Sequence, residues 1–126
     1  MRAPASVDLA GRRVLVVEDH FLIALDMEVM LRALGARVID LASGIDDALA
    51  AIERHPPDFA ILDLKLGATA TALPIAEALL AGAIPFVVVT GYDDFTAIPA
   101  SMQSAPVISK PVPFGTLQAA LATLAL

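Results

Sequence analysis

Short apolar runs rich in Val, Ile and Leu alternate along this chain with longer helix-like segments. Such runs, without polar alternation, are typical of strands that are buried on both faces of a sheet. The strands that we expect are Arg13–Val17, Arg37–Leu41, Asp58–Leu62, Ile84–Val89 and Val107–Ser109. We expect helices over His20–Leu34 and Pro74–Leu80. Between them, a capping box of Ser43 and Asp46 begins another helix, which ends before Pro56. A short or frayed helix is expected within Asp93–Ser104, and a last helix begins at Pro113. A loop, Leu64–Leu73, precedes the third helix.

Five strand–helix units in series predict an α/β fold with a parallel sheet and helices on both faces. We expect the flavodoxin-like, doubly wound arrangement of a five-stranded sheet, with strand order 2-1-3-4-5. The more polar strand, Arg37–Leu41, should then lie at an edge. Residues 1–11 are expected to form an N-terminal extension and residues 12–126 the domain. Ligands bind such sheets beyond the C-terminal strand ends, where the strand order reverses.

Polar residues of complementary charge follow the expected strands. The first strand stops at Glu18-Asp19 and the third at Asp63, whereas Thr90 and Lys110 follow the fourth and fifth. Carboxylates that meet near a core need a cation, because an unpaired buried charge is costly. Oxygen ligands of this kind suit Mg²⁺ or Mn²⁺ rather than zinc. The hydroxyl and the ammonium could bind phosphoryl oxygens, and Asp63 is the natural nucleophile because a carboxylate can form an acyl phosphate.

Each of these residues also has an ordinary structural interpretation. The acidic pair could belong to a helix start, and the other three could be turn or surface residues. Their order and shared position at strand ends favour a site. His20 is expected to begin the helix rather than bind a metal, and His55 to be solvated. The helix expected over His20–Leu34 carries an apolar stripe (Leu22, Leu25 and Val29), and a Glu28–Arg32 pair lies on its solvent-facing side.

Composition narrows the class of protein further. The chain has 126 residues, 58% of them hydrophobic, which is enough for one domain with an aliphatic core. A net charge of −6 argues against nucleic-acid binding. No cysteine, signal peptide or apolar stretch of bilayer length is present, so we expect a soluble, cytoplasmic protein without a membrane partner.

Four segments, VLVVEDHFLIA, ILDLKLG, PFVVVTGYDD and ISKPV, resemble the receiver domain of two-component response regulators over roughly Arg12 to Leu126. The resemblance implies that Asp63 accepts a phosphoryl group from a phosphohistidine on a sensor histidine kinase or a histidine phosphotransfer protein. It also implies a Mg²⁺ site made by Glu18, Asp19, Asp63 and the backbone carbonyl of Lys65. The PFVVVTGYDD stretch looks like that of a subgroup of single-domain regulators common in alphaproteobacteria.

The resemblance further implies that Thr90 binds the phosphoryl group and moves on activation, and that Lys110 forms an ion pair with the phosphoryl group. In this family the peptide bond between the lysine and the following proline, here Pro111, is often cis. Two positions depart from the family pattern. Many receivers carry an aromatic residue three positions before the lysine, where this chain has Val107, and Tyr92 is the candidate to take over part of that role. Lys65, two residues after the nucleophile, is expected to alter phosphoryl lifetime.

The leading hypothesis is a single-domain regulator whose phosphorylation switches protein contacts through the fourth helix, the fifth strand and the last helix. It would be a monomer or weak homodimer, and it would catalyse only its own phosphotransfer and autodephosphorylation. A phosphorylation-independent adaptor is the main alternative, although this chain keeps both Asp63 and Lys110. A nucleotide or flavin binder would need a glycine-rich loop where Glu18-Asp19 stands. A phosphatase or nuclease would need a separate general acid or base.

Overall fold

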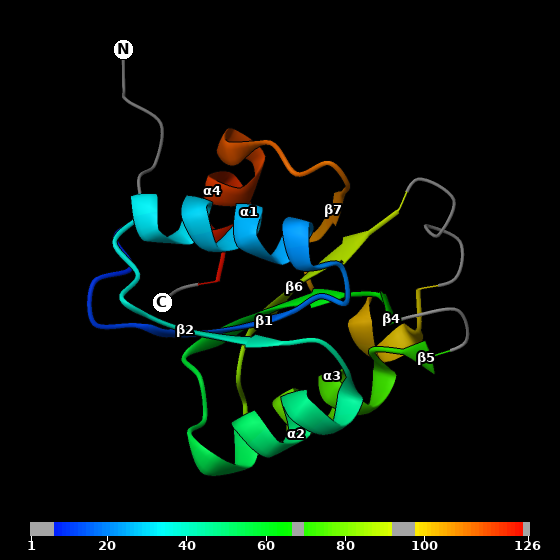
Figure 1. Cartoon of the computed structure of the whole chain (residues 1–126). Helices are drawn as coiled ribbons and strands as arrows, with labels where there is room; N and C mark the ends of the chain where they lie inside the picture. Colours follow the sequence, from blue (N-terminus) through cyan, green and yellow to red (C-terminus); the bar gives the residue numbers. More distant parts are fainter. Residues whose placement is uncertain (1–6, 67–69, 92–97, 125–126) are drawn as a thin grey trace.

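The computed structural model of the chain describes residues 7–66, 70–91 and 98–124 (Figure 1). Its main sheet has five parallel strands in the order β2-β1-β3-β6-β7. The strands are β1 (Arg13–Val17), β2 (Val38–Ala42), β3 (Phe59–Asp63), β6 (Phe86–Thr90) and β7 (Val107–Ser109). Counted within this sheet alone, the order is 2-1-3-4-5, so the flavodoxin-like prediction is confirmed, and β2 lies at an edge as expected.

Within the described residues, four α-helices cover the two faces of the sheet. Figure 1 shows α1 (Phe21–Ala33) and α4 (Phe114–Ala122) on one face, and α2 (Ile45–Arg54) and α3 (Leu73–Ala81) on the other. The expected fourth helix falls partly on residues 92–97, which lie outside the described residues. In its described part, a 3₁₀ turn, η2 (Ala100–Met102), is formed.

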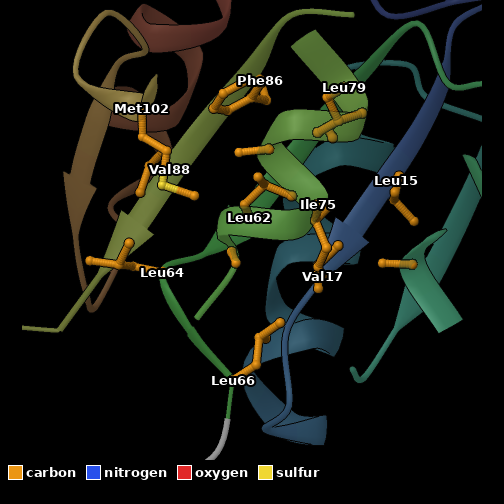
Figure 2. Close-up of a cluster of buried hydrophobic side chains, with 14 of the residues drawn as sticks. Leu15, Val17, Leu62, Leu64, Leu66, Ile75, Leu79, Phe86, Val88 and Met102 are labelled. Carbon is orange, nitrogen blue, oxygen red and sulfur yellow. The ribbon is translucent and has the colours of Figure 1, made fainter. Parts of the chain in front are cut away.

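Side chains that alternate along each strand form two separate cores. In β1, Val14 and Val16 pack toward α1 and α4, whereas Leu15 and Val17 pack toward α2 and α3. Figure 2 shows the second of these clusters, to which α3 contributes its buried face. Because both faces of the sheet are covered, β3 and β6 are buried along their whole length. Burial of each large aliphatic side chain contributes about 1.5–3 kcal/mol, so these central strands contribute much of the hydrophobic stabilisation of the fold.

Two of the three residues of the apolar stripe expected on α1, Leu22 and Val29, face solvent, whereas Leu25 is half-buried. Leu22 and Val29 are 74% and 68% exposed, and the residues that this helix buries are Ala24, Met27 and Leu31. The helix is apolar on most of its circumference, so the spacing of its leucines does not decide which side packs. The expected Glu28–Arg32 pair is present, with Arg32 Nη2 at 2.7 Å from Glu28 Oε2.

The capping box expected at the start of α2 is absent. Gly44 is the N-cap residue, and the Ser43 hydroxyl donates to Asp47 Oδ2 at 3.3 Å. Asp46 and Asp47 in the first turn supply the negative charge that a helix N-terminus favours.

The expected loop between β3 and α3 contains a small antiparallel hairpin of β4 (Lys65–Leu66) and β5 (Ala70–Thr71). The Ala72 amide donates to the Leu64 carbonyl at 2.9 Å, and both residues are buried against the α2–α3 side of the sheet. The backbone directly after Asp63 is therefore held by hydrogen bonds and by the core.

The expected N-terminal extension is docked to the domain in its described part. Leu9 is fully buried in the α1–α4 core, and its amide donates to the Leu34 carbonyl at 2.8 Å.

Candidate functional site

The C-terminal ends of β1 and β3 bring two carboxylates to the point where the strand order reverses. Val17 and Leu62 are partners in the β1–β3 ladder, so Glu18 and Asp63 follow them side by side. Glu18 is 6% exposed and Asp63 is 5% exposed. Two acidic side chains at the end of an aliphatic core are stable only if a positive group compensates them.

Lys110 supplies part of that compensation from the end of β7. Its Nζ lies 2.8 Å from Asp63 Oδ2 and 3.0 Å from Glu18 Oε2, so one ammonium joins both carboxylates. The Lys110 amide donates to the Thr90 carbonyl at 2.9 Å, which fixes the backbone from which the side chain reaches inward. The Lys110–Pro111 peptide bond is cis, as the family resemblance implies.

The pKa values of Asp63 and Lys110 are both shifted by this arrangement. Burial, together with the neighbouring Glu18, raises the pKa of Asp63 to about 7, despite the opposing hydrogen bond from Lys110. Burial by itself would lower the pKa of Lys110, but the two carboxylates outweigh it and the pKa is raised. The rise for Lys110 comes from the two carboxylates, whereas the rise for Asp63 comes first from burial and then from Glu18; a further cation beside Asp63 would favour its ionised form.

The groups around this pair fit a divalent cation. Asp19 follows Glu18, with a side chain that is 26% exposed, and donor atoms of Glu18, Asp19 and His20 lie within 4.8 Å of one another. Carboxylate oxygens at the edge of solvent, with room for waters, are what Mg²⁺ takes in proteins. The Lys65 amide donates to Asp63 Oδ1 at 3.4 Å, so the Lys65 backbone lies beside Asp63; the role of its carbonyl as a ligand stays a prediction.

Thr90 ends the strand next to Asp63. Asp63 is the ladder partner of Val89, so Thr90 lies one residue further along β6, and it pairs with Ser109 of β7. Thr90 is fully buried, and its hydroxyl donates to the Gly91 carbonyl at 3.3 Å. A hydroxyl at this strand end is placed at the same edge of the sheet as the carboxylates.

The remaining predicted residues differ in what the structure shows. Val107 is the first residue of β7 and packs, half-buried, against the α2–α3 core. The Lys65 side chain is exposed. Tyr92 lies outside the described residues, so its predicted role stays a prediction. His20 is the N-cap residue of α1, as expected, but its ring also lies beside the acidic pair, with Nδ1 at 3.3 Å from both Glu18 Oε1 and Asp19 Oδ1.

A doubly wound sheet with two acids, a hydroxyl and a lysine at its strand ends defines the class of response-regulator receivers. The family model of the response regulator receiver domain matches residues 14–122, so the chain belongs to this family.

Individual relatives support the same assignment. The solution structure of SdrG from Sphingomonas melonis Fr1 is similar over 91% of this chain and 97% of that chain, with 36% identity and a TM-score of 0.81. The response regulator PhyR from Brucella abortus is similar over 94% of this chain but 49% of its own, with 25% identity and a TM-score of 0.78.

A curated relative, the transcriptional regulatory protein PdtaR of Mycobacterium tuberculosis, is 40% identical over 55 residues. That match spans 44% of this chain and 27% of PdtaR, so the chain spans about a quarter of this relative's length. Among the described residues, no helix combines the length and hydropathy needed to cross a membrane.

Proposed function

We propose that this receiver is a phosphorylation-dependent switch in a two-component system or phosphorelay, with Asp63 as its phosphoacceptor. The observation that carries the proposal is the buried cluster in which Lys110 Nζ contacts both Asp63, at 2.8 Å, and Glu18, at 3.0 Å. A structural ion pair would need one carboxylate. The second one makes the cluster electrostatically incomplete, which favours a role in binding a cation and an incoming group.

The chemistry follows from the positions of these side chains. A carboxylate oxygen of Asp63 attacks the phosphorus of a phosphohistidine, the P–N bond breaks, and the imidazole leaves with the electron pair. The product is an acyl phosphate on Asp63. Lys110 lies within hydrogen-bond distance of Asp63 and would stabilise the developing charge on the phosphoryl oxygens, and Thr90 would bind them from the next strand.

Glu18, Asp19 and Asp63, together with the Lys65 carbonyl, would hold Mg²⁺ or Mn²⁺. When bound, the cation would neutralise the carboxylates and the transferring phosphoryl oxygens. It would also favour the ionised form of Asp63, which is the nucleophilic form. The chain would thus catalyse only its own phosphotransfer and autodephosphorylation. We place this exchange in the cytoplasm, in keeping with a chain without cysteine.

A sensor histidine kinase or a histidine phosphotransfer protein would bind on the surface of α1 when it transfers the phosphoryl group. The first two residues of this helix, Phe21 and Leu22, are 70% and 74% exposed and follow the acidic pair after one residue. Exposed apolar side chains of this size are typical of contact surfaces. The downstream partner would bind on the side of η2, β7 and α4, where Phe114 is 41% exposed.

Intact mass spectrometry tests the phosphoacceptor directly. The protein is incubated with Mg²⁺ and acetyl phosphate or phosphoramidate, and we expect a single added phosphoryl group. Asp63→Ala should abolish it, whereas Asp46→Ala, an exposed acid in the first turn of α2, should leave it unchanged. No adduct on the wild type, or an adduct on Asp63→Ala, would contradict the proposal; the first result would favour the phosphorylation-independent adaptor.

A further inference from the structure

We propose that His20 is a ligand of the divalent cation, through Nδ1, and that it makes this site prefer Mn²⁺ and later first-row metals over Mg²⁺. The inference rests on the metal site of the proposed function and adds a nitrogen donor to it. It departs from the expectation that this histidine serves only to begin α1.

The distances around Nδ1 match those between neighbouring ligands of one ion. His20 Nδ1 lies 3.3 Å from Glu18 Oε1 and 3.3 Å from Asp19 Oδ1. In an octahedral shell, adjacent donor atoms are separated by the bond length times about 1.4, which is about 2.9 Å for Mg²⁺ bonds of about 2.0–2.1 Å. The spacing of 3.3 Å is close to this value, so a small rotation of the exposed imidazole would bring the three donors around one ion. The three donors are spaced to share one ion.

The position of His20 at the N-cap of α1 does not depend on its imidazole ring. It is the N-cap residue of α1 with an extended backbone (φ −91°, ψ 112°), and its side chain makes no capping hydrogen bond. Its backbone amide donates to Glu18 Oε1 at 3.3 Å, which already fixes the residue against the acid. The imidazole is thus left to face the two carboxylates, and its 69% exposure leaves the site open for waters that complete the shell.

The donor type determines the selectivity. Mg²⁺ strongly prefers oxygen, whereas imidazole nitrogen suits first-row transition metals, whose affinities rise from Mn²⁺ to Cu²⁺. A site with carboxylates and one imidazole should therefore gain affinity for Mn²⁺ from the nitrogen and little for Mg²⁺. Loss of the ring should weaken Mn²⁺ binding by about tenfold and Mg²⁺ binding by less than about twofold.

Pulsed electron paramagnetic resonance of bound Mn²⁺ reads the ligand itself rather than activity. The chain has two histidines, so His55→Ala is the matched control for His20→Ala. Protein without a histidine tag, loaded with Mn²⁺ at pH 8, should show the hyperfine coupling of a directly bound nitrogen in the wild type and in His55→Ala. His20→Ala should lose it. Calorimetric titration of all three proteins with Mn²⁺ and with Mg²⁺ gives the two affinities, and circular dichroism verifies that each variant is folded.

The outcomes separate the inference from the function on which it rests. If Mn²⁺ binds and no nitrogen coupling is seen, or if the coupling survives in His20→Ala, the inference is wrong and the carboxylate site stands. The inference is equally wrong if His20→Ala weakens Mg²⁺ and Mn²⁺ binding by the same factor. If neither metal binds the wild type, both the inference and the metal site of the proposed function fail, whereas the mass test still reports on Asp63 by itself.

Discussion

Replacing Asp63 by asparagine should make the metal-free protein more stable above neutral pH. Asp63 is 5% exposed and shares one lysine with Glu18, so its ionisation adds a second negative charge to a buried pair. Asparagine keeps the shape of the side chain and removes that charge. Lys110 then pairs with Glu18 alone, which is a balanced arrangement.

The size of the effect follows from proton linkage. Burial and the neighbouring Glu18 raise the pKa of Asp63 from 3.8 to about 7, so the folded protein binds one more proton than the unfolded chain between these values. The free energy of unfolding therefore falls by about 1.4 kcal/mol for each pH unit in that window. The whole loss, about 4 kcal/mol, is reached above pH 7 and is absent below pH 3.8. Asp63→Asn should recover up to about 4 kcal/mol at pH 8 and less than about 2 kcal/mol at pH 5.

Urea unfolding in EDTA, followed by far-ultraviolet circular dichroism from pH 5 to 8, measures this difference; the chain has no tryptophan to serve as a fluorescence probe. Asp46→Asn is the control, because Asp46 is exposed at the start of α2 and its replacement should cost a nearly constant few tenths of a kcal/mol over this range. If Asp63→Asn is no more stable than the wild type at pH 8, or if its advantage does not change with pH, the reasoning from buried charge is refuted.

Three further perturbations test other parts of the molecule. Lys65→Ala should change the rate at which phosphorylated Asp63 loses its phosphoryl group, measured by intact mass against time; an unchanged rate would remove Lys65 from the reaction. Leu22→Arg should slow phosphotransfer from a histidine kinase at least about fivefold and leave labelling by acetyl phosphate unchanged, whereas Leu80→Arg, 47% exposed on the opposite face of the sheet, should affect neither. Equal slowing by both arginines would argue against α1 as the contact surface. Phe59→Ala, at a fully buried position of β3, should cost about 3–5 kcal/mol in urea unfolding, and a cost below about 1 kcal/mol would contradict the packing described.

The sheet could be predicted because its strands carry an unambiguous signal. Arg13–Val17 and Val107–Ser109 form strands with the predicted bounds, and the others shift by one or two residues. A short run of β-branched residues without polar alternation, bounded by turn residues, favours a strand that is covered on both faces. Once the strands are known, the handedness and order of such sheets place Glu18 and Asp63 together without reference to side-chain detail.

The features that the sequence did not predict lack such a periodic signal. β4 and β5 are two residues long, too short for alternation to appear, and depend on the burial of Leu64 and Leu66 after β3. On α1, apolar residues occupy most of the circumference, so the packing of Met27 and Leu31 against the sheet leaves Leu22 outside. The direction of the His20 ring depends on the backbone at the helix start, which residue type does not determine.

The start of α1 helps to explain how the buried acids are tolerated. Within the described residues, α1 begins at Phe21, directly after Glu18, Asp19 and His20, and its first turn contains no acid. The positive end of its dipole therefore faces the carboxylates and stabilises them by up to about 1 kcal/mol. That is less than the cost of ionising Asp63, and Lys110 has already been counted in the raised pKa of that residue. In the proposed function a bound cation would supply the rest, so the same buried charge that lowers the stability of the metal-free protein would provide free energy for metal binding. Replacements that balance the cluster should therefore raise stability and weaken metal affinity together.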